Sequence, residues 1–112
     1  MLIAGASLTR VGDHWNKSIL DLAVEAGSAA LKDAGITVPD QIVVGNMFSS
    51  FSSWQENLGA IIADSLMLQG TPALKVESSG ASGAMACNVA DSIIRSGQAN
   101  SVLVIGVEKM RD

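Results

Sequence analysis

The chain has 112 residues, of which 48% are apolar and only 16% charged, and its formal net charge is −4. This composition argues against a disordered chain, and the scattered arrangement of the seven Lys and Arg residues argues against nucleic-acid binding. A single cysteine, Cys87, and a single histidine, His14, exclude a disulfide framework and argue against a zinc site.

The N-terminal run Leu2-Ile3-Ala4-Gly5-Ala6 predicts a short first strand. It lacks the charged start and the long apolar stretch of a signal peptide, and no run in the chain approaches the length of a transmembrane span. We therefore expect a cytoplasmic protein. Residues 7–17 are predicted to form a polar loop in which His14 and Trp15 are structural surface residues.

A helix is predicted from Ser18 to about Ala34. Ser18 with Asp21 three positions later forms the pattern of a capping box at a helix N-terminus. Apolar residues then recur at three- and four-residue spacing, which is typical of one buried helix face. Gly35 directly after this pattern predicts the C-cap.

Residues 41–45 predict a second strand, residues 46–53 a loop and residues 54–67 a second helix. A third strand is predicted to begin at Ala73 and end at Ser78. Several residues in and beside the loop could line a substrate tunnel or contact a partner, and ordinary loop packing explains them equally well. These residues are Asn46, Met47, Phe48, Phe51 and Trp54.

A third helix is predicted over residues 81–95 and a fourth strand over residues 101–107. The order β-α-β-α-β-α-β with continuous apolar strands indicates an α/β fold, with a mostly parallel sheet and helices on both faces. Because the third helix is apolar nearly all round, we expect it to be buried on all sides. The sheet covers one face, and a second layer from elsewhere in the fold or from another chain covers the other. An open sheet ending at the fourth strand lacks a finished edge, so we expect one incomplete domain. Glu108 and Lys109 are expected to cap or pair.

The sharp turn between the third strand and the third helix is the candidate site. Such a turn holds one residue at a helix N-terminus, where enzymes place a nucleophile or an oxyanion donor. The residue at its tip is Gly80, which has no side chain to react. Cys87 lies about 10 Å further along the helix axis and is expected to be a small core residue. Ser79 and Ser82 are expected to cap the helix, because no base is at hand to activate a serine.

Several stretches form a combined pattern: V-E-S-S-G-A-S-G at 76–83, the alanine-rich helix after it, and V-L-V-I-G-V-E-K-M at 102–110. G-D-H-W at 12–15 and V-G-N-M at 44–47 fit the same pattern. Together they resemble the N-terminal part of the thiolase family, in its archaeal and bacterial acetyl-CoA acetyltransferase-like branch. The resemblance covers residues 1–112, as the N-terminal part of a thiolase-like N-terminal domain.

In that family a cysteine in a Cys-Ala-Ser-Gly motif takes the acyl group from acyl-CoA as a thioester. Ala81, Ser82 and Gly83 match the rest of that motif, and Gly80 stands at the cysteine's position. The resemblance implies that Ala81 and Ser82 supply backbone amides and that Met47 contacts substrate. The family's second cysteine and its catalytic histidine belong to a C-terminal half that is absent from this sequence, and His14 is not that histidine.

The resemblance implies a thiolase-like acyltransferase fragment, whose intact relatives condense two acyl-CoA molecules or cleave a 3-ketoacyl-CoA. Gly80 favours an alternative, a non-catalytic thiolase-like subunit that binds acyl-CoA or scaffolds an active partner. We expect acyl-CoA as substrate and no cofactor. A homodimer or tetramer is implied, through antiparallel pairing of the strand that begins at Ala73 and ends at Ser78. The low charged fraction agrees with association.

Overall fold

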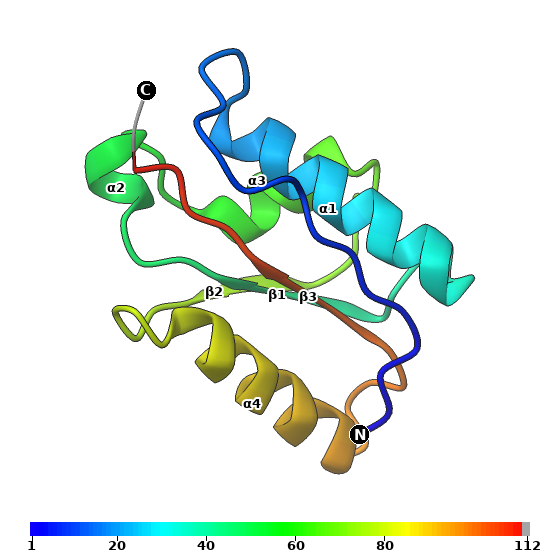
Figure 1. Ribbon diagram of the computed structural model, residues 1–112. Coiled ribbons are helices and arrows are strands. Elements are labelled where there is room, and N and C mark those ends of the chain that lie inside the picture. Colours follow the sequence, from blue (N-terminus) through cyan, green and yellow to red (C-terminus); the bar gives the residue numbers. More distant parts are fainter. Residues whose placement is uncertain (111–112) are drawn as a thin grey trace.

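The computed structural model describes residues 1–110 of the chain. Their helices and strands are, in chain order, α1 (Ile19–Ala34), β1 (Gln41–Gly45), α2 (Ser49–Ser52), α3 (Leu58–Ser65), β2 (Ala73–Val76), α4 (Ser82–Arg95) and β3 (Val102–Gly106). Within this described part the strands form one parallel sheet in the order β2-β1-β3. Helix α4 covers one face of the sheet and helices α1 and α3 cover the other (Figure 1). This confirms the predicted layered α/β fold class.

Strand β1 is the middle strand and is buried on both faces, as its unbroken apolar sequence predicts. Ile42 and Val44 belong to the larger core, which α1 and α3 share with the sheet. Val43 belongs to the smaller core on the opposite face, where it packs with Ala86 and Ile93 of α4. Alternate side chains of one strand therefore anchor both helix layers.

Helix α1 begins and ends where its sequence signals predict. The Ser18 hydroxyl accepts a hydrogen bond from the Asp21 amide at 3.1 Å, and the Asp21 carboxylate accepts one from the Ser18 amide at 2.7 Å. The bond from the Ser18 amide, and then one that the Ser18 hydroxyl donates to the same carboxylate at 2.9 Å, hold the pKa of Asp21 below its ordinary value. Gly35 ends the helix with a φ of 67°, a left-handed conformation that glycine adopts without strain.

The prediction of a first strand at residues 2–6 is wrong. The segment runs beside α1 and outside the sheet, with Leu2 and Ile3 at 88% and 78% exposure (Figure 1). Its polar groups bond to α1: the Ala6 amide donates to Asp33 at 2.9 Å and the Ser7 hydroxyl donates to the Ala26 carbonyl at 2.5 Å. A groove of about 380 Å³ lies between the segment and β3, and residues of both line it. The segment has the composition of a strand, yet it is not paired with β3, the edge strand across this groove.

The second helix is shorter than predicted and part of the loop before it is helical. Residues 49–52 form the single turn α2, and α3 begins only at Leu58. Trp54 and Asn57 have φ values of 50° and 54°, which a right-handed helix does not accept. The two strands that flank the site are also one or two residues shorter at their ends than predicted.

Within the described residues the third helix is buried on one face only, and the second layer expected over its other face stays a prediction. Helix α4 buries Ala86, Ala90 and Ile93 against the sheet. The face turned away from the sheet is exposed. Cys87 is also exposed and lines the groove shared by the N-terminal segment and β3, so it is not a core residue. One sheet covers only one face of a helix, and the described residues contain no second layer over α4.

Candidate functional site

The carboxyl ends of the three strands meet at one edge of the sheet, where α/β proteins commonly hold their sites. The amide of Asn46, after β1, donates to the Val76 carbonyl at the end of β2 at 3.1 Å. The amide of Val107, after β3, donates to the Gly45 carbonyl at 3.1 Å. These bonds bring the segments that follow β1, β2 and β3 together around one place.

Residues 77–82 form a tightly bonded turn from β2 into α4. The Ser82 hydroxyl accepts from the Ser78 amide at 2.9 Å and donates to the Ser79 carbonyl at 2.7 Å, and Ser82 is buried. Ser79 has a φ of 50°, which costs a residue other than glycine conformational energy. Its amide donates to the Glu77 carboxylate at 2.6 Å. Ser82 therefore holds the turn in a strained conformation from within.

Two expectations for this turn are corrected. The amides of Ala81 and Ser82 already donate to the Ser78 and Ser79 carbonyls, at 2.9 and 3.1 Å, so neither is free to bind a substrate oxygen. No side chain caps the N-terminus of α4, so neither Ser79 nor Ser82 has the capping role. The hydroxyl of Ser82 bonds within the turn instead.

Gly80 lies at the tip of the turn and is exposed. A Cβ atom built on Gly80 would have no heavy atom within 4 Å, apart from its chain neighbours, and its φ is not positive. The backbone therefore does not require glycine here, and a side chain would point into open space beside the start of α4. The turn can carry a reactive side chain without rearrangement.

Met47, predicted to lie near the substrate, does lie beside the turn. Its sulfur accepts a hydrogen bond from the Ser79 hydroxyl at 3.5 Å. The sequence-predicted positions Met47, Gly80, Ala81 and Ser82 thus come together at the carboxyl edge of the sheet. His14 does not join them, because its ring bonds to the Arg10 carbonyl at 2.5 Å within the N-terminal loop.

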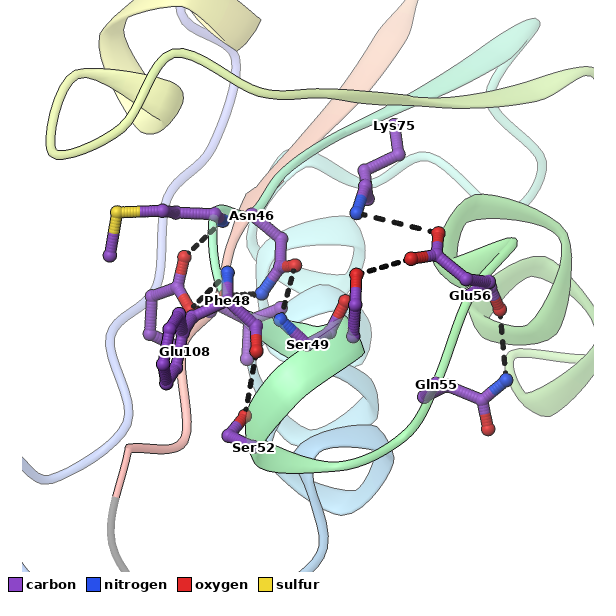
Figure 2. A network of polar contacts seen from close by, with 11 residues as sticks. Asn46, Phe48, Ser49, Ser52, Gln55, Glu56, Lys75 and Glu108 are labelled. Atoms are coloured by element: carbon purple, nitrogen blue, oxygen red, sulfur yellow. Dashed lines mark hydrogen bonds and ion pairs between the residues drawn. The ribbon is translucent and has the colours of Figure 1, made fainter.

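A polar network that joins the buried Asn46 to the exposed Glu108 is the part of the site that sequence reasoning missed (Figure 2). The Asn46 side chain, fully buried, donates to the Val107 carbonyl at 2.9 Å and to Glu108 at 3.1 Å, and its oxygen accepts from the Ser49 amide at 3.1 Å. The Glu108 carboxylate also accepts from the amides of Met47 and Phe48. Glu108 was expected only to cap or pair, and it caps these amides. The available signal was their position, because Asn46 directly follows β1 and Glu108 comes two residues after the end of β3.

In the rest of the segment between β1 and α3, some side chains pack on one another and others are exposed. Phe48 stacks on Phe51 with ring centroids 5.4 Å apart, whereas Trp54 is 90% exposed. The Ser50 hydroxyl, and then the Lys75 ammonium at 3.8 Å, hold the pKa of the Glu56 carboxyl below its ordinary value (Figure 2). The loop is therefore tied to β2 as well as to the turn.

Two features are not found in the described part of the chain. Among residues 1–110, no helix is long and apolar enough to cross a membrane. The same residues contain no group of three or more His, Cys, Asp or Glu side chains that could hold a metal ion.

Comparisons with known proteins agree with this geometry. The family described as "Thiolase, N-terminal domain" matches residues 1–112. The chain is 37% and 39% identical, each over 112 residues, to the acetyl-CoA acetyltransferases of Methanothermobacter thermautotrophicus and Methanocaldococcus jannaschii. These matches cover 98% of this chain and 29% of each relative, so the chain spans less than a third of their length.

Among solved structures, the fold is similar to that of a 3-oxoacyl-[acyl-carrier-protein] synthase III from Aquifex aeolicus, with a TM-score of 0.75 and 23% identity. The similarity covers 91% of this chain and 33% of that one. At this identity the likeness concerns the fold alone. It agrees with the layered α/β arrangement described above.

Proposed function

This chain belongs to the thiolase family, and from that premise we propose that it supplies the acyl-binding turn of a protein that handles acyl-CoA thioesters. A protein of the relatives' length would condense two acyl-CoA molecules or cleave a 3-ketoacyl-CoA. The observation that carries the proposal is position 80, which stands at the tip of a rigid strand-to-helix turn with open space around it. A thiolate there would lie beside the N-terminus of α4, which favours negative charge.

The glycine favours a second function, acyl-CoA binding without acyl transfer. Gly80 carries no nucleophile, and the exposed Cys87 lies further along α4, away from the helix N-terminus. We propose that in this form the chain acts as a non-catalytic subunit that binds acyl-CoA or scaffolds an active partner. The turn keeps its internal hydrogen bonds without a side chain at position 80, so its shape does not depend on a nucleophile there.

We expect Gly80→Cys in the full-length protein to form a thioester with acetyl-CoA. The introduced thiolate attacks the thioester carbonyl, the bond from the carbonyl carbon to the CoA sulfur breaks, and CoA leaves as a thiolate that takes up a proton. Intact-protein mass spectrometry should show one added acetyl group, and peptide mapping should place it at position 80.

Cys87 is the internal control, because it is present with and without the substitution. Acetylation that is equal at both thiols, or absent at position 80, contradicts the acyl-transfer proposal. Calorimetric titration of the Gly80 protein with acetyl-CoA then tests the second function. Failure to bind acetyl-CoA together with failure to recruit another chain rejects it.

We propose a homodimer formed through β2, which is an edge strand of the described sheet. The Ile42 and Asn46 amides bond to the carbonyls of Pro72 and Val76, so the backbone groups of Ala73 and Lys75 face away from β1. Those outward groups can pair with the same strand of a second copy. The cytoplasmic location stays an expectation from the sequence.

Sedimentation equilibrium should report a dimer for the native protein. Lys75→Pro removes one outward N–H group and should give a monomer. Lys75→Ala removes the same charge and its 3.8 Å ion pair with Glu56 while keeping the N–H, so it should remain dimeric. A native monomer, or a dimer that survives Lys75→Pro, would reject pairing through β2.

A further inference from the structure

Glu108 joins two segments that are far apart in the sequence. Its carboxylate accepts hydrogen bonds from the amides of Met47 and Phe48 and from the Asn46 carboxamide, the last at 3.1 Å (Figure 2). Bonds to a charged acceptor are stronger than neutral ones, and three donors converge on this one carboxylate. Glu108 therefore fixes the backbone direction of the loop directly after β1.

The fixed loop in turn contacts the turn that carries position 80. The Ser79 hydroxyl donates to the Met47 sulfur at 3.5 Å, and Ser79 is the residue with a φ of 50° immediately before Gly80. A residue in this region of backbone space keeps its conformation only when its surroundings hold it. Met47 is the one contact from the loop to this strained residue that the described part of the chain shows as a hydrogen bond.

We propose that Glu108 is a positioning residue for position 80, acting through Met47 and Ser79. It holds the 46–48 loop so that the Met47 thioether, together with the Ser82 hydroxyl and the Glu77 carboxylate, keeps Ser79 in its strained conformation. That conformation directs residue 80 to the N-terminus of α4. The inference rests on the proposed function only in treating position 80 as the reacting position. Glu108 itself touches no reacting atom.

The test uses the full-length Gly80→Cys protein and iodoacetamide, which needs no acyl-CoA. The thiolate attacks the carbon that bears iodine, a carbon–sulfur bond forms, and iodide leaves. We measure alkylation rates of the introduced thiol and of Cys87 in the same molecule by peptide mass spectrometry across pH. With Glu108→Gln added, we expect the rate at position 80 to fall about threefold at neutral pH while Cys87 keeps its rate.

A positioning role for Glu108 and simple removal of its charge predict opposite changes in the alkylation rate at position 80. Loss of the Glu108 bonds frees the turn, so the introduced thiol spends less time at the helix N-terminus and its apparent pKa rises toward that of an ordinary thiol. Removing a negative charge without moving the turn would favour the thiolate, and the rate would rise. A rate that rises or stays unchanged overturns the proposal, and so does an equal change at both thiols, since that reports loosening of the whole fold.

Three further variants sharpen the test. Glu56→Gln is the matched control: Glu56 lies between α2 and α3, bonds to Ser50 and pairs with Lys75. This variant should leave the rate at position 80 unchanged. Met47→Leu keeps the volume and removes the sulfur, so it should lower the rate without touching Glu108. Combined with Glu108→Gln it should add little further effect, because both act along one path. An additive double variant, or an inert Met47→Leu, overturns the path through Met47.

The two proposals fail in distinguishable ways. If acetyl-CoA does not acylate the introduced thiol but alkylation still depends on Glu108, the acyl-transfer proposal fails and the positioning role stands. If acylation succeeds and Glu108→Gln leaves alkylation unchanged, the positioning role fails alone. Glu108→Asp adds a check on geometry, because it keeps the charge and withdraws the carboxylate by one methylene. It should lower the rate at position 80 as well.

Discussion

Gly45→Ala should lower the free energy of unfolding by about 3 kcal/mol, as overpacking of a tight contact does. A Cβ atom at Gly45 would lie 2.6 Å from the Ser82 carbonyl oxygen and 3.0 Å from the Gly83 Cα atom. These are backbone atoms, which cannot rotate aside as a flexible side chain can. The first turn of α4 must therefore move away from β1, and the turn at position 80 moves with it.

Urea denaturation followed by circular dichroism measures the effect. Gly83→Ala is the matched control, because it adds the same methyl group in the first turn of α4, where a Cβ atom has no heavy atom within 4 Å beyond its chain neighbours and its own helix backbone. Helix propensity predicts that this control gains about 0.5–1 kcal/mol. Equal midpoints for the two variants would show that β1 and α4 do not approach as closely as described.

The parts of the fold that sequence predicts well are those with local signals. Helix α1 begins at the Ser18–Asp21 capping box and ends at Gly35, as expected, because both signals act within a few residues. The central strand β1 is predicted correctly because an unbroken apolar run of this length suits a strand buried on both faces.

The wrong predictions concern features that depend on distant partners or on unusual backbone. Residues 2–6 have strand composition, yet they are not paired with the edge strand β3, and hydrogen bonds from Ala6 and Ser7 tie the segment to α1 instead. Trp54 and Asn57 adopt positive φ, which residue type alone does not reveal, so α3 starts late. The apolar composition of α4 predicts that both of its faces are covered, but it does not show which element covers the face turned away from the sheet.

The candidate site divides in the same way. Position 80 is singled out by the contiguous motif around it, and Met47 by the resemblance of the stretch at 44–47, and the structure places the two segments side by side. The bond between Asn46 and Glu108 spans 62 residues and exists only because parallel strands bring their carboxyl ends together. Predicting that pair requires the register of β1 with β3, which the sequence does not provide.

Asn46→Ala should cost about 3 kcal/mol of unfolding free energy, because it leaves buried polar partners without bonds. The Asn46 side chain is fully buried, donates to the Val107 carbonyl and to Glu108, and accepts from the Ser49 amide. One residue therefore ties the ends of β1 and β3 to the start of α2. Urea denaturation of the variant measures the loss.

Ser49→Ala is the matched control for this site. The Ser49 hydroxyl is also buried, but it has no hydrogen-bond partner among the described residues, so its removal should leave the stability unchanged or slightly raise it. A similar loss in both variants would mean that the cost reflects burial volume alone. A large loss confined to Asn46→Ala would assign it to the hydrogen bonds.

Asn46→Asp separates hydrogen bonding from shape, because the two side chains have nearly the same size. The introduced carboxylate would face the Val107 carbonyl and the Glu108 carboxylate, where the native amide donates. Burial and the neighbouring negative charge raise the pKa of the introduced carboxyl in the folded state above its unfolded value. Its destabilising effect should therefore be full at neutral pH and shrink as the pH falls through the folded pKa. Asn46→Ala adds no titrating group, so its loss of unfolding free energy relative to the native chain should not shrink as the pH falls. Parallel pH profiles of stability for the two variants would contradict a donor role for Asn46.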